Sequence, residues 1–386
     1  MPSSHSSTNG ALNGLLVVSI EQAVAAPLCT FRLVQGGARV IKVERASGET
    51  ARHYDRAASG TSAYFAWLNA GKESAVLDLK SEAGLSLLRA MIAKADVLVQ
   101  NLAPGAMARM GLDYAAIEAL NPRLISLSIM GYDPHSSYAE MRAYDALVQA
   151  ESGICSVTGN VDERAKVGVS VADIGTGMAA HAAVLEALIE RGVTGKGKRL
   201  DIAMFDTMAD WMSVPLLQFE GSGQAPRREG LAHATIYPYG AFACADGAFL
   251  LSIQNQREWV SLCADVLERP DLIDHTLYHD NPARSDNRAA LDTVMRPIFA
   301  GMSLTACEAR LRAAGLAFGR LSEVSDLASH PALKRRQLML ETGEVISAPL
   351  QPGRNSDDQI DRTGSVPKLP ALGEHTDAVI EEFAGD

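Results

Sequence analysis

The first 130 residues alternate between short apolar runs and longer stretches with helical spacing. The runs are rich in β-branched residues and end at polar or glycine-containing turns, which predicts strands. The stretches "APLCTFRLVQGG" and "EAGLSLLRAMIAKA" repeat apolar residues every three or four positions, as amphipathic helices do. Strands that alternate with helices predict a parallel sheet in a doubly wound α/β domain. The predicted strands lie at 15–20, 39–45, 74–79, 96–101 and 121–132.

A different pattern begins beyond residue 200. The stretch "WMSVPLLQFEGSGQAPRREG" ends in Gly, Pro and Arg residues that are typical of a linker. After it, two alternating runs around Asp246-Gly247 predict a β-hairpin, and two amphipathic patterns at 258–268 and 287–302 predict helices. We expect a disordered tail over 1–13 and a small α+β domain over 225–325, and the Pro- and Gly-rich segment from Leu333 onward is too irregular to form a third domain.

Composition narrows the classes of partner. The chain has 386 residues and a formal net charge of −11, which disfavours nucleic acid or an anionic membrane as a partner. Its five cysteines have no CxxC or metal-binding spacing, which is typical of reduced thiols in a cytoplasmic protein. The polar N-terminus does not resemble a signal peptide, and no apolar run approaches the roughly 18 residues that cross a bilayer.

Several common kinds of site are excluded by their missing motifs. The turn "IEQAVAAPLCT" contains no glycine, whereas a dinucleotide site needs glycines so that the pyrophosphate can approach the backbone. Pro27 in this turn suits the first turn of a helix instead. No GxSxG elbow and no HExxH motif occurs, and the nine histidines lack metal-ligand spacing. The candidate chemistry is therefore that of carboxylates, with no metal.

Asp173 is the carboxylate with the most informative surroundings. It follows "KVGVSVA", a strand-like run, and precedes Gly175 and Gly177. One interpretation places it at the carboxyl end of a strand, where open α/β sheets bind ligands and where the glycines would admit an acyl group. The other interpretation makes it the N-cap of the helix that follows. The spacing alone leaves both interpretations open.

The chain resembles the family III CoA-transferases, the group that includes formyl-CoA transferase and the carnitine and bile-acid CoA-transferases. The resemblance covers nearly the whole chain in the right order, and "QNLAPGAMARMGL" is its most specific segment. It implies a large Rossmann-like, CoA-binding domain built from both chain ends, over 14–215 and 326–386, a smaller domain between them, and an interlocked homodimer. It also implies acyl-CoA and carboxylic acid substrates, with coenzyme A as a substrate and no permanently bound cofactor.

By this resemblance Asp173 matches the family's nucleophilic aspartate, and Tyr144 and Asp145 match positions that orient it. The implied reaction passes through a mixed anhydride and an aspartyl-CoA thioester, whose oxyanions we expect the backbone N–H groups after Asp173 to stabilise. The positions that match CoA contacts include cations for the phosphates of CoA. They are Ala25, Arg45, Leu77, Lys80, Asn101, Leu102, Arg109, Met110 and Arg142.

The chain also departs from the family's patterns. Val24 stands where formyl-CoA transferase has a glutamine, and His233 and Thr235 in "GLAHATIYPYG" replace its glycine loop, so we expect a different acyl pocket and not oxalate or formate. Tyr144 stands where the related racemases have a catalytic histidine, which disfavours an acyl-CoA racemase or epimerase. A noncatalytic CoA-binding scaffold is the third alternative, and the intact Asp173 argues against it.

The substrate follows from resemblance alone. "LAHATIYPYGAF" and "QNQREW" are similar to members that act on branched C4 or C5 dicarboxylates such as mesaconate, citramalate or itaconate, within one molecule or between two. The free carboxylate of such an acid needs a cation or a hydroxyl donor. His233, Thr235 and Arg52 are the candidates for that contact.

Overall fold

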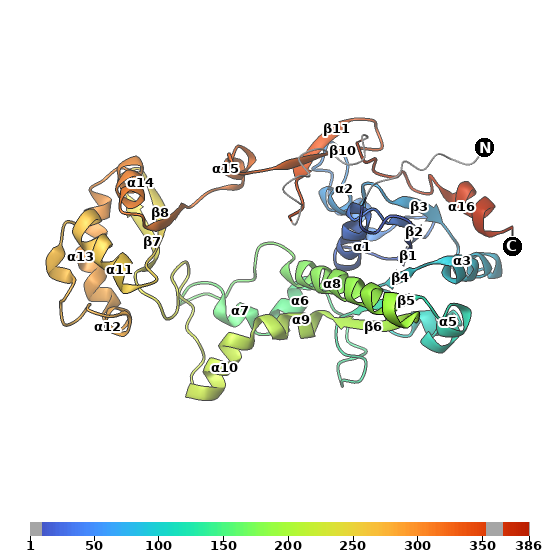
Figure 1. The fold of residues 1–386 in the computed structure, drawn as a ribbon, viewed down its shortest axis with the longest axis horizontal. Helices are drawn as coiled ribbons and strands as arrows, with labels where there is room; N and C mark the ends of the chain where they lie inside the picture. Colours follow the sequence, from blue (N-terminus) through green and yellow to red (C-terminus); the bar gives the residue numbers. More distant parts are fainter. Residues whose placement is uncertain (1–9, 353–365, 386) are drawn as a thin grey trace. The chain divides into compact units, whose positions relative to one another are not determined.

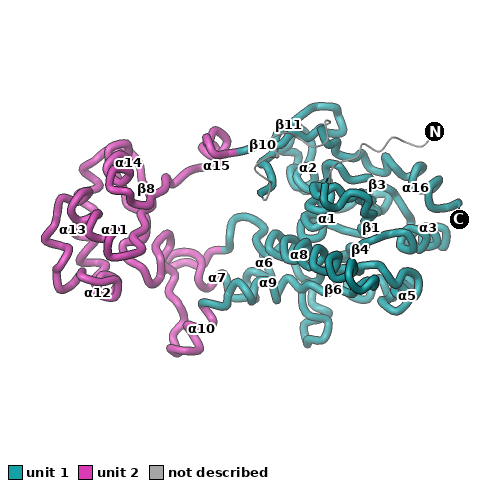
Figure 2. The backbone as a smooth tube through the Cα atoms, viewed as in Figure 1, with its two compact units in different colours: residues 1–154, 166–214, 334–386 teal, residues 155–165, 215–333 magenta. Residues whose placement is uncertain are grey.

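The computed structural model describes residues 10–352 and 366–385, which form two units (Figure 2). Unit 1 comprises residues 1–154, 166–214 and 334–386, and unit 2 comprises residues 155–165 and 215–333. Residues 155–165 and 326–333, which we expected in the large domain, thus belong to unit 2. There Arg228 donates to the carbonyl oxygens of Ser156, Asn160 and Val161.

Unit 1 is built on a six-stranded sheet in the order β3-β2-β1-β4-β5-β6, and every pair in it is parallel. The order reverses between β1 and β4, as in doubly wound dinucleotide-binding folds. Five of the strands confirm the sequence prediction. The strands are β1 (Leu16–Ile20), β2 (Arg39–Glu44), β3 (Glu73–Val76), β4 (Val97–Gln100), β5 (Ile125–Met130) and β6 (Lys198–Ala203).

Helices cover both faces of this sheet (Figure 1). On one face, α1 (Ala25–Gln35) and α8 (Val171–Thr194) pack their small and aliphatic residues against β1, β4 and β5. On the other face, α3 (Glu82–Lys94), α5 (Tyr114–Leu120) and α16 (Thr376–Phe383) complete a second core. The remaining elements of unit 1 are η1 (Thr50–His53), α2 (Ala63–Asn69), α4 (Ala106–Arg109), α6 (Asp145–Glu151), α9 (Met204–Trp211), β10 (Arg335–Met339) and β11 (Val345–Pro349).

The C-terminal segment completes unit 1 at two places. The β10–β11 hairpin packs on α2 through Leu338 and Phe65. Beyond it, His375 and Thr376 hydrogen-bond the outer edge of β3: the His375 N–H donates to the Ser74 carbonyl, and the Val76 N–H donates to Thr376 Oγ1. An edge strand that would otherwise expose its backbone is thereby covered.

The predicted tail is ordered over its last residues. Residues 10–13 form a turn, and the Leu12 N–H donates to the Gly36 carbonyl at 2.9 Å. Leu12 packs against the α1 core, which explains why this end of the segment is fixed. Residues 1–9 lie outside the described part of the chain.

Two predictions for the sheet need correction. The sequence missed β6, because this edge strand carries Lys198, Arg199 and Asp201, and charged residues are common on exposed sheet edges. The run before Asp173 is not a strand. Its alternating valines have no neighbouring strand; instead the Val167 N–H donates to Gln149 Oε1 at 2.8 Å, and Gln149 Nε2 donates to the Val169 carbonyl.

Unit 2 contains a three-stranded antiparallel sheet in the order β7-β8-β9. The strands are β7 (Tyr239–Cys244), β8 (Gly247–Ser252) and β9 (Ala317–Arg320). The hairpin and both predicted helices are confirmed, the first helix continuing as a π-turn at Leu262–Val266. The helices are α11 (Gln256–Ser261), η3 (Pro270–Leu272), α12 (Asn281–Asp286), α13 (Arg288–Ala300), α14 (Leu304–Ala313) and α15 (Val324–Ala328), with α7 (Ile154–Val157) at the unit boundary.

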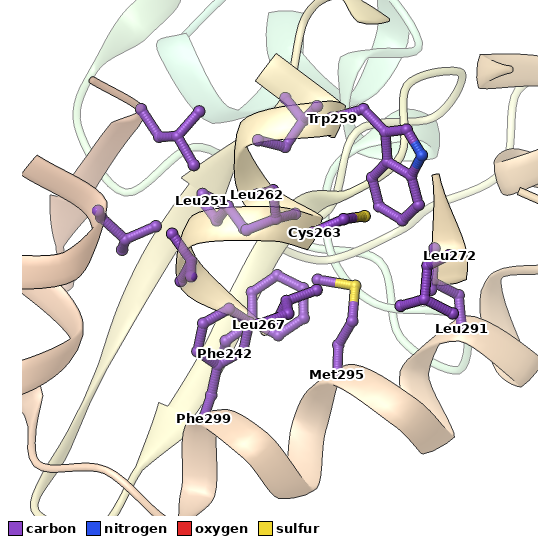
Figure 3. Packing of buried hydrophobic residues seen from close by; sticks show 14 of the residues in the cluster. Phe242, Leu251, Trp259, Leu262, Cys263, Leu267, Leu272, Leu291, Met295 and Phe299 are labelled. Carbon is purple, nitrogen blue, oxygen red and sulfur yellow. The ribbon is translucent and has the colours of Figure 1, made fainter. Parts of the chain in front are cut away.

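Aromatic packing holds the core of unit 2 together (Figure 3). Phe242 and Phe249 from the hairpin meet Phe299 from α13 at ring-centroid distances of 5.2 and 5.1 Å. Trp259 is fully buried beside them. This core draws only on residues from 237 to 318, a continuous segment of the chain.

The predicted linker is partly helical. Helix α10 (Ser213–Ser222) takes up its first half, because "SVPLLQFE" is apolar enough to continue as a helix. Its apolar side chains remain exposed, with Leu217 at 67% and Val214 at 65%. Large apolar side chains that are exposed together on one helix often mark a surface that contacts a partner.

Helix α8 corrects another expectation. Among the described helices it alone is long and apolar enough to cross a membrane by length and composition, with a mean hydropathy of 1.2 over 18 residues. Core helices pass the same test. Ala180, Val184 and Ala187 of α8 are buried against the sheet, which is the packing of a core helix.

Close packing of α8 on α1 depends on Gly177. A Cβ at this position would lie 2.5 Å from the Ala25 carbonyl oxygen, which is backbone and cannot turn aside. Gly177→Ala should therefore lower the free energy of unfolding by about 1–3 kcal/mol in urea titrations. Gly192→Ala on the same helix meets open space and should raise that free energy by about 0.5–1 kcal/mol. Equal effects of the two substitutions would contradict the assigned packing.

Candidate functional site

The carboxyl ends of the parallel strands bring most of the predicted CoA contacts to one edge of the sheet. Leu77 follows β3, Arg45 follows β2, and Asn101 and Leu102 follow β4. Ala25 begins α1 directly after the β1 loop. Open α/β sheets bind ligands at this edge, where the strand order reverses. The geometry therefore groups residues that are as much as 77 positions apart in sequence.

The loop between β1 and α1 lies at the reversal point and is held by its neighbours. The Asn101 side chain accepts from the Gln22 N–H and donates to the Gln22 carbonyl, both at 2.9 Å. The Ala23 N–H donates to Glu49 Oε2 at 2.8 Å. Ala23 has φ of +64°, a left-handed conformation that alanine rarely adopts. Such strain is concentrated at functional sites.

Asp173 lies in the first turn of α8, not at a strand end and not at the N-cap. The N-cap residue is Ser170, whose side chain makes no capping hydrogen bond. Asp145 from α6 supplies the cap: its Oδ1 accepts from the Ala172 N–H at 2.8 Å and from the Asp173 N–H at 3.3 Å. Because Asp145 satisfies the helix start, the Asp173 carboxylate is free for another role.

The Asp173 carboxylate is half-buried and, within the described ranges, has no hydrogen-bond or ion-pair partner. Burial, with a further contribution from the Asp145 charge, raises the pKa of Asp173 to about 7. A carboxyl group with such a pKa, placed beside a loop, marks a candidate functional site.

The surroundings of Asp173 are set by the packing of α8 on α1. Gly177 contacts the Ala25 carbonyl, and Asp173 lies one turn earlier on the same helix face. Ile174, the residue after Asp173, packs against a small apolar cluster that contains the buried Val24. The structure thus brings the predicted pocket residue Val24 close to the Asp173 turn.

The start of α1 has unused backbone donors. Within the described part of the chain, the N–H groups of Val24, Ala25 and Ala26 have no acceptor, and no side chain caps the helix. All three residues are at most 2% exposed. Buried backbone donors without acceptors are rare in proteins, and a helix N-terminus favours negative charge. Sequence reasoning missed Ala26, although the absence of Ser, Thr, Asp or Asn before Pro27 was a usable signal.

Two expectations about the residues after Asp173 are wrong. The Ile174 N–H donates to the Ser170 carbonyl as part of the helix, so it is not available to an oxyanion. The space beside the two glycines is filled by neighbouring helices and not left for an acyl group. A Cβ on Gly175 would lie 2.9 Å from the Trp211 ring of α9, and Gly177 faces α1.

The remaining predicted residues have different surroundings. Lys80, Arg109 and Arg142 are exposed, Met110 is half-buried, and Arg45 is exposed with its Nε bonded to the Gly48 carbonyl. Tyr144 is 67% exposed at the start of α6. His233 and Thr235 lie in unit 2, where His233 Nδ1 accepts from the Thr235 N–H at 3.1 Å.

Arg52 is not available for a substrate carboxylate. Its guanidinium donates to both Glu44 carboxylate oxygens at 2.7 and 2.8 Å, and it stacks 3.9 Å from the centre of the Phe65 ring. The Glu341 carboxylate accepts from a third nitrogen. Arg52 is therefore a structural ion pair, and this expectation is corrected.

A cavity of about 310 Å³ lies beside the β4 carboxyl end, between α4, α5 and the strands β5 and β6. Its lining is mostly apolar and includes Leu102, Tyr132 and Ser128. Asp173 is not among the lining residues, so this cavity neighbours the predicted CoA contacts without holding the carboxylate.

Comparison with known proteins decides the family. A model described as CoA-transferase family III matches residues 12–376. The chain belongs to CoA-transferase family III. It is 33% identical over 380 residues to the acetyl-CoA:oxalate CoA-transferase of Acetobacter aceti, covering 97% of this chain and 96% of that protein. It is 31% identical over 404 residues to the succinyl-CoA:mesaconate CoA-transferase of Haloarcula marismortui, covering 98% and 97%.

The solved structures agree with this membership. A CAIB/BAIF family protein from Brucella suis superposes with a TM-score of 0.83 at 33% identity, covering 97% of this chain and all of that one. The protein is therefore an enzyme of the CoA-transferase type, and the predicted resemblance is confirmed. CoA thioesters are the substrates of such enzymes.

The raised pKa of Asp173 predicts a pH-dependent cost to stability. In the unfolded chain the carboxyl ionises near pH 3.8, and in the folded chain near pH 7. The folded state thus binds the proton more tightly between these values, so its stability falls as pH rises from about 4 to about 7. Asp173→Asn should remove this loss and increase the free energy of unfolding by roughly 1–3 kcal/mol at pH 8.

Denaturant titrations at pH 5, 6, 7 and 8 would measure the difference between the two proteins. The difference in the free energy of unfolding between Asp173→Asn and the native protein should increase from pH 5 to pH 7 and then become constant. Asp145→Asn removes the charge beside Asp173 but keeps an oxygen that accepts from the start of α8, so it should reduce the stability difference between Asp173→Asn and the protein that retains Asp173. The new Nδ2 would face Gln149 Nε2, which should lower the free energy of unfolding by about 1 kcal/mol. A difference that is constant across this range would contradict the raised pKa.

Proposed function

We propose that this enzyme transfers CoA between a small acyl-CoA and a small dicarboxylic acid, with Asp173 as the nucleophile. The observation that carries the proposal is the free, half-buried Asp173 carboxylate beside the uncapped start of α1. A carboxylate that has no partner in the protein can react with an external acyl group.

The chemistry balances without a metal or redox step. An Asp173 oxygen attacks the thioester carbon, the C–S bond breaks, and a mixed anhydride and CoA thiolate form. The thiolate then attacks the aspartyl carbonyl and releases the donor acid, leaving an aspartyl-CoA thioester. The acceptor carboxylate reverses both steps and leaves as the new acyl-CoA. Asp173 is regenerated as a carboxylate.

Each attack creates a negative oxygen that needs donors. The N–H groups of Val24, Ala25 and Ala26 support this role, since they are buried and Val24 shares an apolar cluster with Ile174, the residue after Asp173. Fixed donors in a site that excludes water stabilise such an oxyanion strongly. This assignment replaces the expected donors after Asp173, which are bonded within α8.

The carboxyl edge of the sheet suits the nucleotide end of CoA. Arg45, Lys80, Arg109 and Arg142 are exposed cations on loops or short helices after β2, β3, β4 and β5. In a chain with a net charge of −11, such cations supply the local attraction that CoA phosphates require. Asn101 takes part indirectly, because its side-chain amide is already bonded to the Gln22 backbone.

Two of the chain's relatives support a dicarboxylate as the acid, since their names specify oxalate and mesaconate. Oxalate therefore stays among the candidates despite Val24. Branched C4 or C5 dicarboxylates are the favoured class, with His233 and Thr235 as proposed contacts to the second carboxylate. In their loop His233 is half-buried and Thr235 is exposed.

Labelling of the protein tests the reaction directly. Incubation with succinyl-CoA or acetyl-CoA, followed by hydroxylamine, should convert Asp173 to a hydroxamate that peptide mass spectrometry detects. Asp173→Ala should abolish the label and lower transfer by at least about 10³-fold, because the nucleophile is gone. Asp173→Asn serves as the closely shaped control and should also be inactive.

Other outcomes would identify the alternatives. Exchange of solvent deuterium into the α-carbon without a label on Asp173 would indicate a racemase. Binding of CoA without any turnover of thioesters would indicate a scaffold. Near-normal transfer by Asp173→Ala would refute the proposed nucleophile.

We also propose that two chains form a homodimer, interlocked as the resemblance implies. Exposed apolar side chains on α10 and α15 support a partner, among them Leu217 at 67% and Val324 at 84%. Light scattering should give twice the chain mass of 41.0 kDa. A monomer at micromolar concentration would contradict the dimer.

A further inference from the structure

Beneath the β1–α1 loop lies a fully buried group of four charged side chains. Lys42 on β2 and Lys72 before β3 meet Glu21 at the end of β1 and Glu49 before η1. Lys42 Nζ lies 2.5 Å from Glu49 Oε1 and 3.2 Å from Glu21 Oε1, and Lys72 Nζ lies 2.7 Å from Glu21 Oε1. Two cations and two anions make the group neutral.

Two neighbouring polar side chains also hydrogen-bond to this group. Asn69 Oδ1 accepts from both lysines at 3.1 Å, and the Thr30 hydroxyl donates to Glu21 Oε2 at 2.6 Å. Although burial opposes its charge, the two lysines lower the pKa of Glu21 to about 2. Removal of one member of such a network leaves a buried charge unpaired, so its geometry is tightly fixed.

One atom of the network reaches out of it to the loop. Glu49 Oε2 accepts from the Ala23 N–H at 2.8 Å, while Oε1 is fixed by Lys42. The donor of this hydrogen bond is thus the one residue of the loop that adopts a left-handed conformation, which alanine usually avoids. The next residue, Val24, begins the segment whose N–H groups have no acceptor among the described residues. Its side chain belongs to the apolar cluster against which Ile174 packs.

We infer that Glu49 is a positioning residue for acyl transfer: through the Ala23 N–H it sets the direction of the Val24–Ala26 backbone beside Asp173. Within the described residues the Glu49 carboxylate bonds Lys42 and the Ala23 N–H, and neither is proposed to meet substrate. Its influence on the site therefore passes through one peptide group. The inference rests on the proposed function for its kinetic consequence, while its effect on the loop can be measured without any substrate.

The key variant is Glu49→Gln, which keeps an oxygen near the Ala23 N–H but loses the ion pair with Lys42. Hydrogen exchange of a peptide spanning residues 18–28 should become faster in this variant. Single-turnover acylation of Asp173 should slow by about 10- to 100-fold, with less than about a twofold change in KM for the acyl-CoA, because the cations at the sheet edge are untouched.

A second substitution separates positioning from general damage. Glycine adopts the left-handed conformation without the cost that alanine incurs. Ala23→Gly in the Glu49→Gln background should therefore recover about 3- to 10-fold of the acylation rate. A role limited to stability would not give this rescue. Glu341→Gln is the matched control, since it removes an exposed carboxylate from Arg52 at the edge of the same region and should change neither readout.

Each outcome has a distinct meaning. Unchanged hydrogen exchange at 18–28, or faster exchange with an unchanged acylation rate, overturns the inference. If no thioester labels Asp173 in the native protein, the proposed function fails, whereas a faster exchange in Glu49→Gln still supports control of the loop. Should Glu49→Gln not fold, Glu49→Asp retains the charge for Lys42, shortens the reach to Ala23, and should give the same pattern.

Discussion

The hydrogen bonds from the start of α8 to Asp145 determine how the rest of the site is used. A helix start leaves N–H groups that need acceptors, and a nearby Asp is the usual acceptor. In this protein Asp145 from α6 accepts the hydrogen bonds from the start of α8, so Asp173 does not have to accept them. Asp173 can therefore stay unpaired at the price of a raised pKa.

The two helices that meet at the site have opposite arrangements at their N-termini. The start of α8 is capped and carries a carboxylate, whereas the start of α1 is uncapped and offers N–H groups. The contact through Gly177 sets these two starts beside each other. The proposed nucleophile thus comes from α8 and the proposed donors from α1. The two helices can pack this closely because Gly177 has no side chain.

Most of the fold, but less of the site, could be predicted from the sequence. β-branched runs and helical spacing identified five strands and their helices because these signals are local. β6 escaped because its exposed edge carries charges, and the run before Asp173 misled because the Gln149 amide replaces a neighbouring strand. The cap from Asp145 and the link from Glu49 to Ala23 join residues 28 and 26 positions apart, which spacing alone cannot reveal. Asp173 itself was identified by resemblance.

The return of the C-terminal segment to unit 1 has a consequence for biosynthesis. As the chain leaves the ribosome, β3 emerges some 300 residues before His375 and Thr376, which cover its edge. Unit 2 draws its core from a continuous segment and can fold while that edge is still bare. The sheet of unit 1 is therefore completed only after the whole of unit 2 has been synthesised.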